Sequence, residues 1–102
     1  MTKKEIREKF RTDVFERDQH KCVFCGETED LDAHHITDRK EMPNGGYVKE
    51  NGITVCKTDH KKAEIWHKSG KKMYEQGYHP DDLYKKINSS YELALEKSKT
   101  LC

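Results

Sequence analysis

Three cysteines constrain the fold of this chain more than any other feature of its sequence. Cys22 and Cys25 form a C-x-x-C pair closed by Gly26, and Cys56 lies 31 residues beyond Cys25. Two thiolates at this spacing can chelate one tetrahedral Zn²⁺. A C-x-x-C pair at the start of a helix can instead be a redox pair. Here the pair precedes a glycine and an acidic loop, which favours a metal.

The composition explains why the chain would need a metal. Its 102 residues predict one domain, residues 1–102. Only 32% of the residues are hydrophobic and 38% are charged, so the chain can bury little apolar surface. Small domains of this kind often need a bound metal or a disulfide for stability. There is no apolar run that could span a membrane, and the charged N-terminus is not of the signal-peptide type. We therefore expect a cytoplasmic protein with thiolate ligands rather than disulfides.

The distribution of charge says more than the net charge of +1. Lysines and arginines are concentrated in residues 1–11 and 57–72, and the acidic stretch "GETEDLD" lies between them. Charged runs are usually solvated faces, so this pattern supports a phosphate-binding surface only weakly.

Hydrophobic periodicity and turn residues predict an α+β fold. Thr2 and Glu5 fit a capping box at the start of the first helix, and Pro80 suits the first position of the last one. A long polar loop separates two short stretches of β-type composition. The predicted elements are a helix at 3–18, strands at 32–36 and 53–56, a helix from about 58 to 70 and a C-terminal helix at about 80–97.

The fourth ligand of the predicted zinc is open to two interpretations. Asp59 stands at C-x-x-D spacing from Cys56, whereas the adjacent His60 is chemically the more usual zinc ligand. We favour Asp59, because His60 fits a second site. The predicted structural zinc ligands are Cys22, Cys25, Cys56 and Asp59.

Two adjacent histidines indicate that second site. His34 and His35 fall in the first predicted strand, where neighbouring side chains point to opposite faces. His60 and Glu64 are separated by four residues and share one face of the following helix. With His34 they can form an open three-ligand site of the kind that catalytic metals use. His35 then points away from the ligands, and its free imidazole is suited to act as a general base on water.

The segments "RDQHKCVFC", "DAHHI", "NGITVC" and "HKKAE", in this order, resemble the HNH endonucleases over about residues 11–67. The resemblance implies a ββα-metal core with a C-x-x-C zinc knuckle, flanked by N- and C-terminal helices. It assigns His35, Asn51 and His60 as catalytic residues, and His34, His60 and Glu64 as ligands of the catalytic ion. His34 stands where relatives often have Asp, and Glu64 where colicin-type members have a further His.

The function implied by the resemblance is metal-dependent hydrolysis of DNA phosphodiester bonds, by a nickase or a double-strand cutter. His35 would activate water, and one divalent cation (Mg²⁺, Mn²⁺, Ni²⁺ or Zn²⁺) would stabilise the 3′-oxygen leaving group. Asn51 would pin the loop between the strands. The implied partner is DNA, bound by a monomer or weak dimer. Likeness to small phage-encoded members adds packaging or homing machinery as a partner, with the host cytosol as the location.

One departure and one alternative accompany this interpretation. Many zinc-bearing relatives have C-x-x-C-H where this chain has "CKTDH", so the zinc is held by three cysteines and Asp59, held more weakly, or absent. The alternative is a non-catalytic zinc module that binds nucleic acid or protein, with His60 as the fourth zinc ligand. His67 falls on the same helix face as His60, and we expect it to be a surface or DNA-facing residue rather than a ligand.

Overall fold

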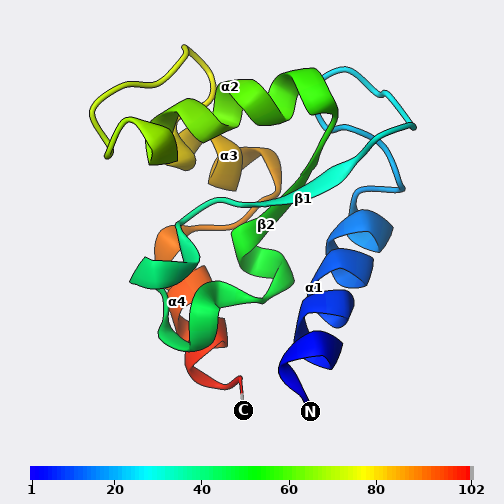
Figure 1. The fold of residues 1–102 in the computed structure, drawn as a ribbon, viewed down its shortest axis with the longest axis vertical. Coiled ribbons are helices and arrows are strands. Elements are labelled where there is room, and N and C mark those ends of the chain that lie inside the picture. The colour runs from blue at the N-terminus through cyan, green and yellow to red at the C-terminus, as the bar shows by residue number, and fades with distance from the viewer. Residues whose placement is uncertain (102) are drawn as a thin grey trace.

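The computed structural model describes residues 1–101, which form four α-helices and a two-stranded sheet (Figure 1). The elements are α1 (Lys3–Arg17), β1 (Asp32–His35), β2 (Gly52–Val55), α2 (Lys57–Lys68), α3 (Pro80–Lys86) and α4 (Tyr91–Lys99). Three short 3-10 turns lie between the strands: η1 (Arg39–Glu41), η2 (Pro43–Gly46) and η3 (Lys49–Asn51). The predicted α+β class, with a ββα core between terminal helices, is confirmed. Within the described residues no helix is both long and apolar enough to cross a membrane.

The two strands pair antiparallel and are covered by helices on both faces. His35 lies opposite Gly52, and Asp32 lies opposite Val55. Position 52 has to be glycine, because a Cβ there would lie 2.5 Å from Val14 Cγ2 and 2.7 Å from the Phe10 ring. Helix α1 therefore packs directly on this face of the sheet, while α2 crosses the other face (Figure 1).

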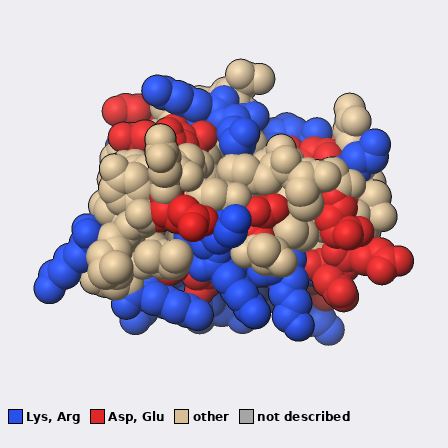
Figure 2. All heavy atoms as spheres, turned by 90° about the horizontal axis from the view of Figure 1, so that it is seen from above, with Lys and Arg blue, Asp and Glu red and all other residues tan. Residues whose placement is uncertain are grey.

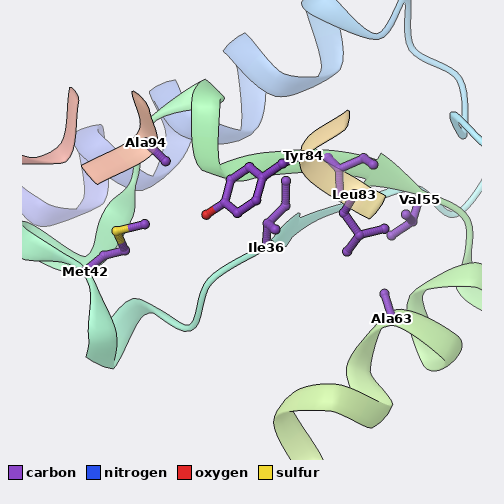
Figure 3. Close-up of a cluster of buried hydrophobic side chains, with 8 residues drawn as sticks. Ile36, Met42, Val55, Ala63, Leu83, Tyr84 and Ala94 are labelled. Carbon is purple, nitrogen blue, oxygen red and sulfur yellow. The ribbon is translucent and has the colours of Figure 1, made fainter. Parts of the chain in front are cut away.

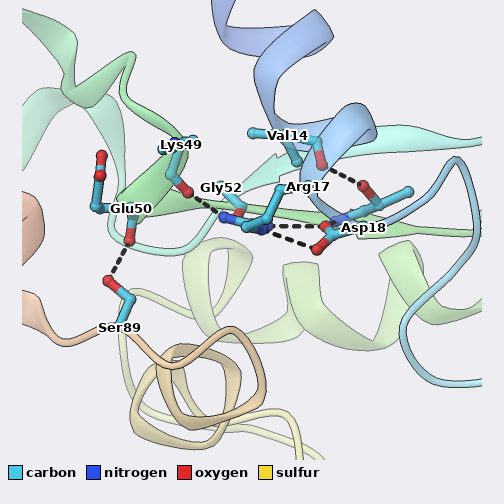
Figure 4. Close-up of polar contacts among 8 residues, drawn as sticks. Val14, Arg17, Asp18, Lys49, Glu50, Gly52 and Ser89 are labelled. Carbon is cyan, nitrogen blue, oxygen red and sulfur yellow. Dashed lines mark hydrogen bonds and ion pairs between the residues drawn. The ribbon is translucent and has the colours of Figure 1, made fainter.

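A cluster of polar contacts joins the end of α1 to the start of β2 (Figure 4). The Arg17 guanidinium contacts the Asp18 carboxylate at 2.8 Å and donates to the backbone oxygens of Lys49 and Gly52. Asp18 also accepts a hydrogen bond from the Thr54 backbone NH at 2.9 Å. The segment between Lys49 and Thr54, which includes Asn51, is thus held at both ends by the last turn of α1.

The core lies between α2, α3, α4 and the second strand (Figure 3). Ile36 and Val55 are fully buried, and Tyr84 reaches in from α3. The cluster consists of Ile36, Met42, Ile53, Val55, Ala63, Leu83, Tyr84 and Ala94. This small core is what the low hydrophobic content predicts. No residue of α1 belongs to it.

The prediction of one continuous helix at 80–97 is wrong. The chain leaves helical geometry at Asn88, whose φ of 56° is in the left-handed region that ends helices. The hydroxyl of Ser90 then accepts a hydrogen bond from the Leu93 NH and caps α4. Leu83 of α3 and Ala94 of α4 enter the same core, so the apolar stripe continues across both helices. The hydrophobic periodicity therefore gave no sign of the break at Asn88.

Candidate active site and metal sites

The structure brings together all four residues predicted to hold zinc. The ligand atoms of Cys22, Cys25, Cys56 and Asp59, which we term the knuckle, all lie within 4.8 Å of one another. Asp59 Oδ2 is 3.2 Å from Cys22 Sγ and 3.1 Å from Cys56 Sγ, and Cys25 Sγ is 3.7 Å from Cys56 Sγ. Three sulfurs and one carboxylate oxygen at these separations fit a single tetrahedral cation.

Local backbone geometry sets the knuckle. The Gly26 NH donates to the Cys22 carbonyl at 2.9 Å, and the turn needs a φ of 79° at Gly26. Cys56 is the N-cap of α2, which places Asp59 in the first turn of the helix. The spacing C-x-x-D is thus the spacing between a helix cap and the third residue of that helix.

Tyr78 belongs to the knuckle's surroundings, and the sequence motifs did not identify it. Its hydroxyl donates to Asp59 Oδ1 at 2.7 Å, and its ring stacks on Phe24 with the centroids 4.5 Å apart. No motif points to Tyr78, because it lies in the irregular connection between α2 and α3.

Burial and hydrogen bonds together set the pKa values of the knuckle residues. It raises the pKa of Cys56 to about 12 and also raises that of Cys22. Burial pushes the pKa of Asp59 upward too, but hydrogen bonds from Tyr78, Cys56 and Cys22 outweigh it and the net pKa is lowered. Asp59 is therefore an anion at neutral pH, and a bound cation would displace the thiol protons.

A second cluster contains the residues predicted to hold the catalytic ion. The ligand atoms of His34, His60 and Glu64 lie within 4.8 Å of one another. Glu64 Oε1 is 2.9 Å from His60 Nε2 and 4.0 Å from His34 Nδ1. His34 is buried and its Nε2 has no hydrogen-bond partner. Two imidazoles and one carboxylate at these separations fit a divalent cation.

Asp32 orients one of these ligands. Its Oδ2 lies 3.2 Å from His60 Nδ1, on the opposite side of the ring from Glu64. Carboxylates in this position fix the tautomer of a metal-binding histidine and direct its other nitrogen to the ion. The available sequence signal was that Asp32 precedes His34 by two residues, which places both on one face of the strand.

The two adjacent histidines pack against different helices, as strand alternation predicts. His34 lies against His60 of α2, with ring centroids 5.2 Å apart, whereas His35 stacks on Phe10 of α1 at 4.5 Å. Tyr47 meets the His35 ring edge-on at 4.7 Å. His35 Nε2 is buried without a partner, so the ring is less open to water than its predicted role suggested.

Both histidines nevertheless reach one cleft of about 340 Å³, because His35 is the last residue of its strand. We call this the histidine cleft. It is lined by Ala33, His34, His35, Asp38, Arg39, His60, Glu64 and His67. Arg39 is the only arginine or lysine in this lining, and no motif had indicated it.

His67 and Asn51 support the histidine cleft in different ways. His67 Nε2 is 2.9 Å from the His35 carbonyl oxygen, and this half-buried side chain lines the cleft without belonging to the three-ligand cluster. Asn51 is fully buried and does not line the cleft. Its amide accepts from the Thr37 NH at 2.9 Å and donates to the carbonyls of Thr37 and Gly46. Asn51 thereby ties the loop between the strands to β2.

Comparison with known families identifies the segment that carries both clusters. Residues 22–64 match the sequence profile of the HNH endonuclease family. These residues form an HNH domain. The match begins at the first knuckle cysteine and ends at Glu64, so every predicted ligand of both clusters lies inside it. Neither the curated proteins nor the solved structures yield a match to this chain.

His34 and His35 of the HNH domain are neutral at physiological pH, because both have a lowered pKa. Burial, and to a smaller extent the charge of Arg39, lowers the pKa of His35 to about 4. The pKa of His34 is held well below its usual value by burial and by the neighbouring His67 and His60. Neutral imidazoles can bind a cation and accept a proton, which are the two roles that the cleft requires.

We expect acid to destabilise the HNH domain through His35. Between the unfolded pKa of about 6.5 and the folded pKa of about 4, the unfolded state binds more protons. Stability is thus fully present above pH 6.5 and is lost as the pH falls towards 4. From pH 7 to pH 5 the loss due to His35 should be about 2 kcal/mol.

Urea unfolding of the wild type and His35→Gln, at pH 7 and pH 5 in the same zinc concentration, measures this difference. Effects of pH on metal binding are common to both proteins and cancel. Equal pH dependence in the two proteins would show that His35 is not held neutral by the fold.

Proposed function

We propose that this HNH domain is a metal-dependent endonuclease that hydrolyses DNA phosphodiester bonds at the histidine cleft. The supporting observation is that a three-ligand cation cluster and a neutral, unpaired imidazole share one cleft. The match of residues 22–64 to the HNH endonucleases, which act on DNA, indicates the class of reaction.

The cation would be held by His34, His60 and Glu64. When bound, it would polarise the phosphate and stabilise negative charge on the departing 3′ oxygen. The candidates are Mg²⁺, Mn²⁺, Ni²⁺ and Zn²⁺, and two imidazole donors suit the transition metals best. Asp32 holds His60 in the orientation that this role needs.

His35 would act as the general base. Its neutral ring would accept a proton from the attacking water. Ring contacts with Phe10 and Tyr47 fix the orientation of the His35 ring, and His67 Nε2 contacts the backbone carbonyl oxygen of His35. Asn51 would act indirectly, by fixing the loop that follows His35.

Arg39 would contact the substrate's phosphate. One of its nitrogens, Nη1, lies 3.2 Å from the Tyr47 hydroxyl, and the side chain is otherwise exposed at the cleft. A guanidinium can pair with two phosphate oxygens while the nucleophile approaches from the other side.

One edge of the surface supports contact with a polyanion. Figure 2 shows lysine and arginine side chains gathered along the lower edge of the face seen from above, while acidic side chains gather mainly on its right, with a smaller group at upper left. Exposed lysines of α2 include Lys57, Lys61 and Lys68. We infer that these contact DNA phosphates, which positions a duplex without selecting its sequence.

The outcome on duplex DNA would depend on the number of copies. One histidine cleft serves one phosphodiester, so a monomer would nick and a weak dimer would cut both strands. A phage packaging or homing machine is the partner suggested by the resemblance to phage-encoded members. The knuckle would hold structural Zn²⁺ and would take no part in the chemistry.

Counting metals separates the nuclease from a non-catalytic zinc module. The nuclease should bind two ions. His34→Ala should lose one ion and keep the knuckle ion, whereas Cys22→Ser should lose both, because the histidine cluster needs the folded domain. A module with His60 as a zinc ligand would bind one ion, which Cys22→Ser would remove and His34→Ala would not. The geometry favours two, because Asp59 rather than His60 completes the knuckle within the described residues. Elemental analysis of the two variants and the wild type provides the count.

A further inference from the structure

The two carboxylate oxygens of Asp59 have different surroundings. Oδ2 faces the sulfurs of Cys22 and Cys56 at 3.2 and 3.1 Å, and Oδ1 accepts the hydrogen bond from the Tyr78 hydroxyl at 2.7 Å. A carboxylate can bind a cation through one oxygen or through both. Here one oxygen is directed at the ligand cluster and the other is already engaged.

The Tyr78 hydroxyl is held in place by packing on the knuckle itself. Its ring stacks on Phe24, with an interplanar angle of 20°, and Phe24 stands between the two cysteines of the C-x-x-C turn. Lys62 Nζ lies 5.7 Å from the centroid of the Tyr78 ring, and the Tyr78 NH donates to the Glu75 carbonyl at 2.9 Å. The donor is thus oriented by contacts that do not involve Asp59.

We propose that Tyr78 is a positioning residue for the knuckle metal, which makes Asp59 a ligand through Oδ2 alone. A thiolate at position 59 would offer a single donor atom and would need no such partner. A carboxylate offers two, and Tyr78 removes one of them. The inference rests on occupation of the knuckle by a cation, and it extends the metal's surroundings to a residue outside the matched segment 22–64.

Zinc affinity measured by chelator competition tests the proposal. Tyr78→Phe keeps the stacked ring and removes only the hydroxyl, so the fold should survive. Loss of an outer hydrogen-bond partner typically weakens metal binding 10–100-fold, and we expect a loss in this range. Tyr74→Phe is the matched control: this tyrosine lies on the same connection, is 53% exposed and packs against Trp66 instead. It should leave the affinity unchanged.

A double-mutant cycle that combines Tyr78→Phe with Asp59→Cys separates positioning of the Asp59 carboxylate from a general stabilisation of the fold by Tyr78. With cysteine at position 59 the hydroxyl has no carboxylate to orient, so Tyr78→Phe should have no effect on zinc affinity. An equal loss in both backgrounds, or no loss in the wild-type background, would overturn the proposal.

Cobalt(II) spectra give a readout that does not depend on cleavage. The thiolate-to-cobalt band reports the knuckle alone, because the histidine cluster has no sulfur. In Tyr78→Phe this band should keep its intensity, while the ligand-field bands change as Oδ1 becomes free to bind. Identical ligand-field bands in wild type and variant would contradict the inference. Absence of the thiolate band in wild type would remove its premise, yet would leave the nuclease proposal to be decided by the cleavage assay.

Discussion

Replacing His35 with alanine should lower plasmid cleavage by about 10²–10⁴-fold, the contribution typical of a general base. The effect should be in kcat, because the variant retains His34, His60 and Glu64 and should bind the cation with the wild-type affinity. The measurement is conversion of supercoiled plasmid to nicked and linear forms with Mg²⁺, Mn²⁺, Ni²⁺ and Zn²⁺ in turn.

Two controls make this result specific. His20→Ala removes an exposed histidine outside the histidine cleft and should cleave like the wild type. Because His35 fills space between Phe10 and Tyr47, the melting temperature of the variant must be compared, and His35→Gln offers a replacement closer in size. If His35→Gln and His35→Ala both cleave at the wild-type rate with every metal, His35 is not the base.

Removing the knuckle metal should unfold most of the domain. Structural zinc sites contribute apparent binding free energies of about 10–16 kcal/mol, and small domains are stable by only about 5–15 kcal/mol in total. The free energy of zinc binding is therefore as large as the whole free energy of unfolding of a small domain. It matters most here because the core is small and the knuckle joins the segment after α1 to the start of α2.

Circular dichroism of the wild type before and after a strong zinc chelator, and of Cys22→Ser, measures this loss. Both treatments should abolish the cooperative thermal transition, and excess zinc should restore it only in the wild type. His34→Ala, which disrupts the other cluster, should keep the transition. A chelated wild type that melts at the same temperature as the zinc-loaded protein would show that hydrophobic packing suffices.

The local parts of the fold and of the candidate site could be predicted from sequence. The capping box of Thr2 and Glu5 is present as expected, because its hydrogen bonds join residues three apart. The pairing of His60 with Glu64 follows from the helical period, and the opposite packing of His34 and His35 from the strand period. Each of these depends on a regular backbone over a few residues.

Residues that act across the fold could not be found this way. Tyr78 and Arg39 lie outside the quoted motifs, and Asp32, although part of "DAHHI", had no predicted role. All three matter because separate segments meet at Asp59, the histidine cleft and His60. The break at Asn88 was missed for the opposite reason: a continuous apolar stripe concealed a change of backbone direction.

The sequence by itself determined which side chains could bind metal, their spacing, and the periods that assign each to a strand or a helix. Only the tertiary structure decided the outer contacts: that Asp32 orients His60, that Tyr78 occupies one oxygen of Asp59, and that both adjacent histidines reach one cleft. The physical reason is range. Periodicity and capping act over three or four residues, whereas these contacts join residues 19 to 32 positions apart and depend on how α1, α2 and the connection after α2 pack on the sheet.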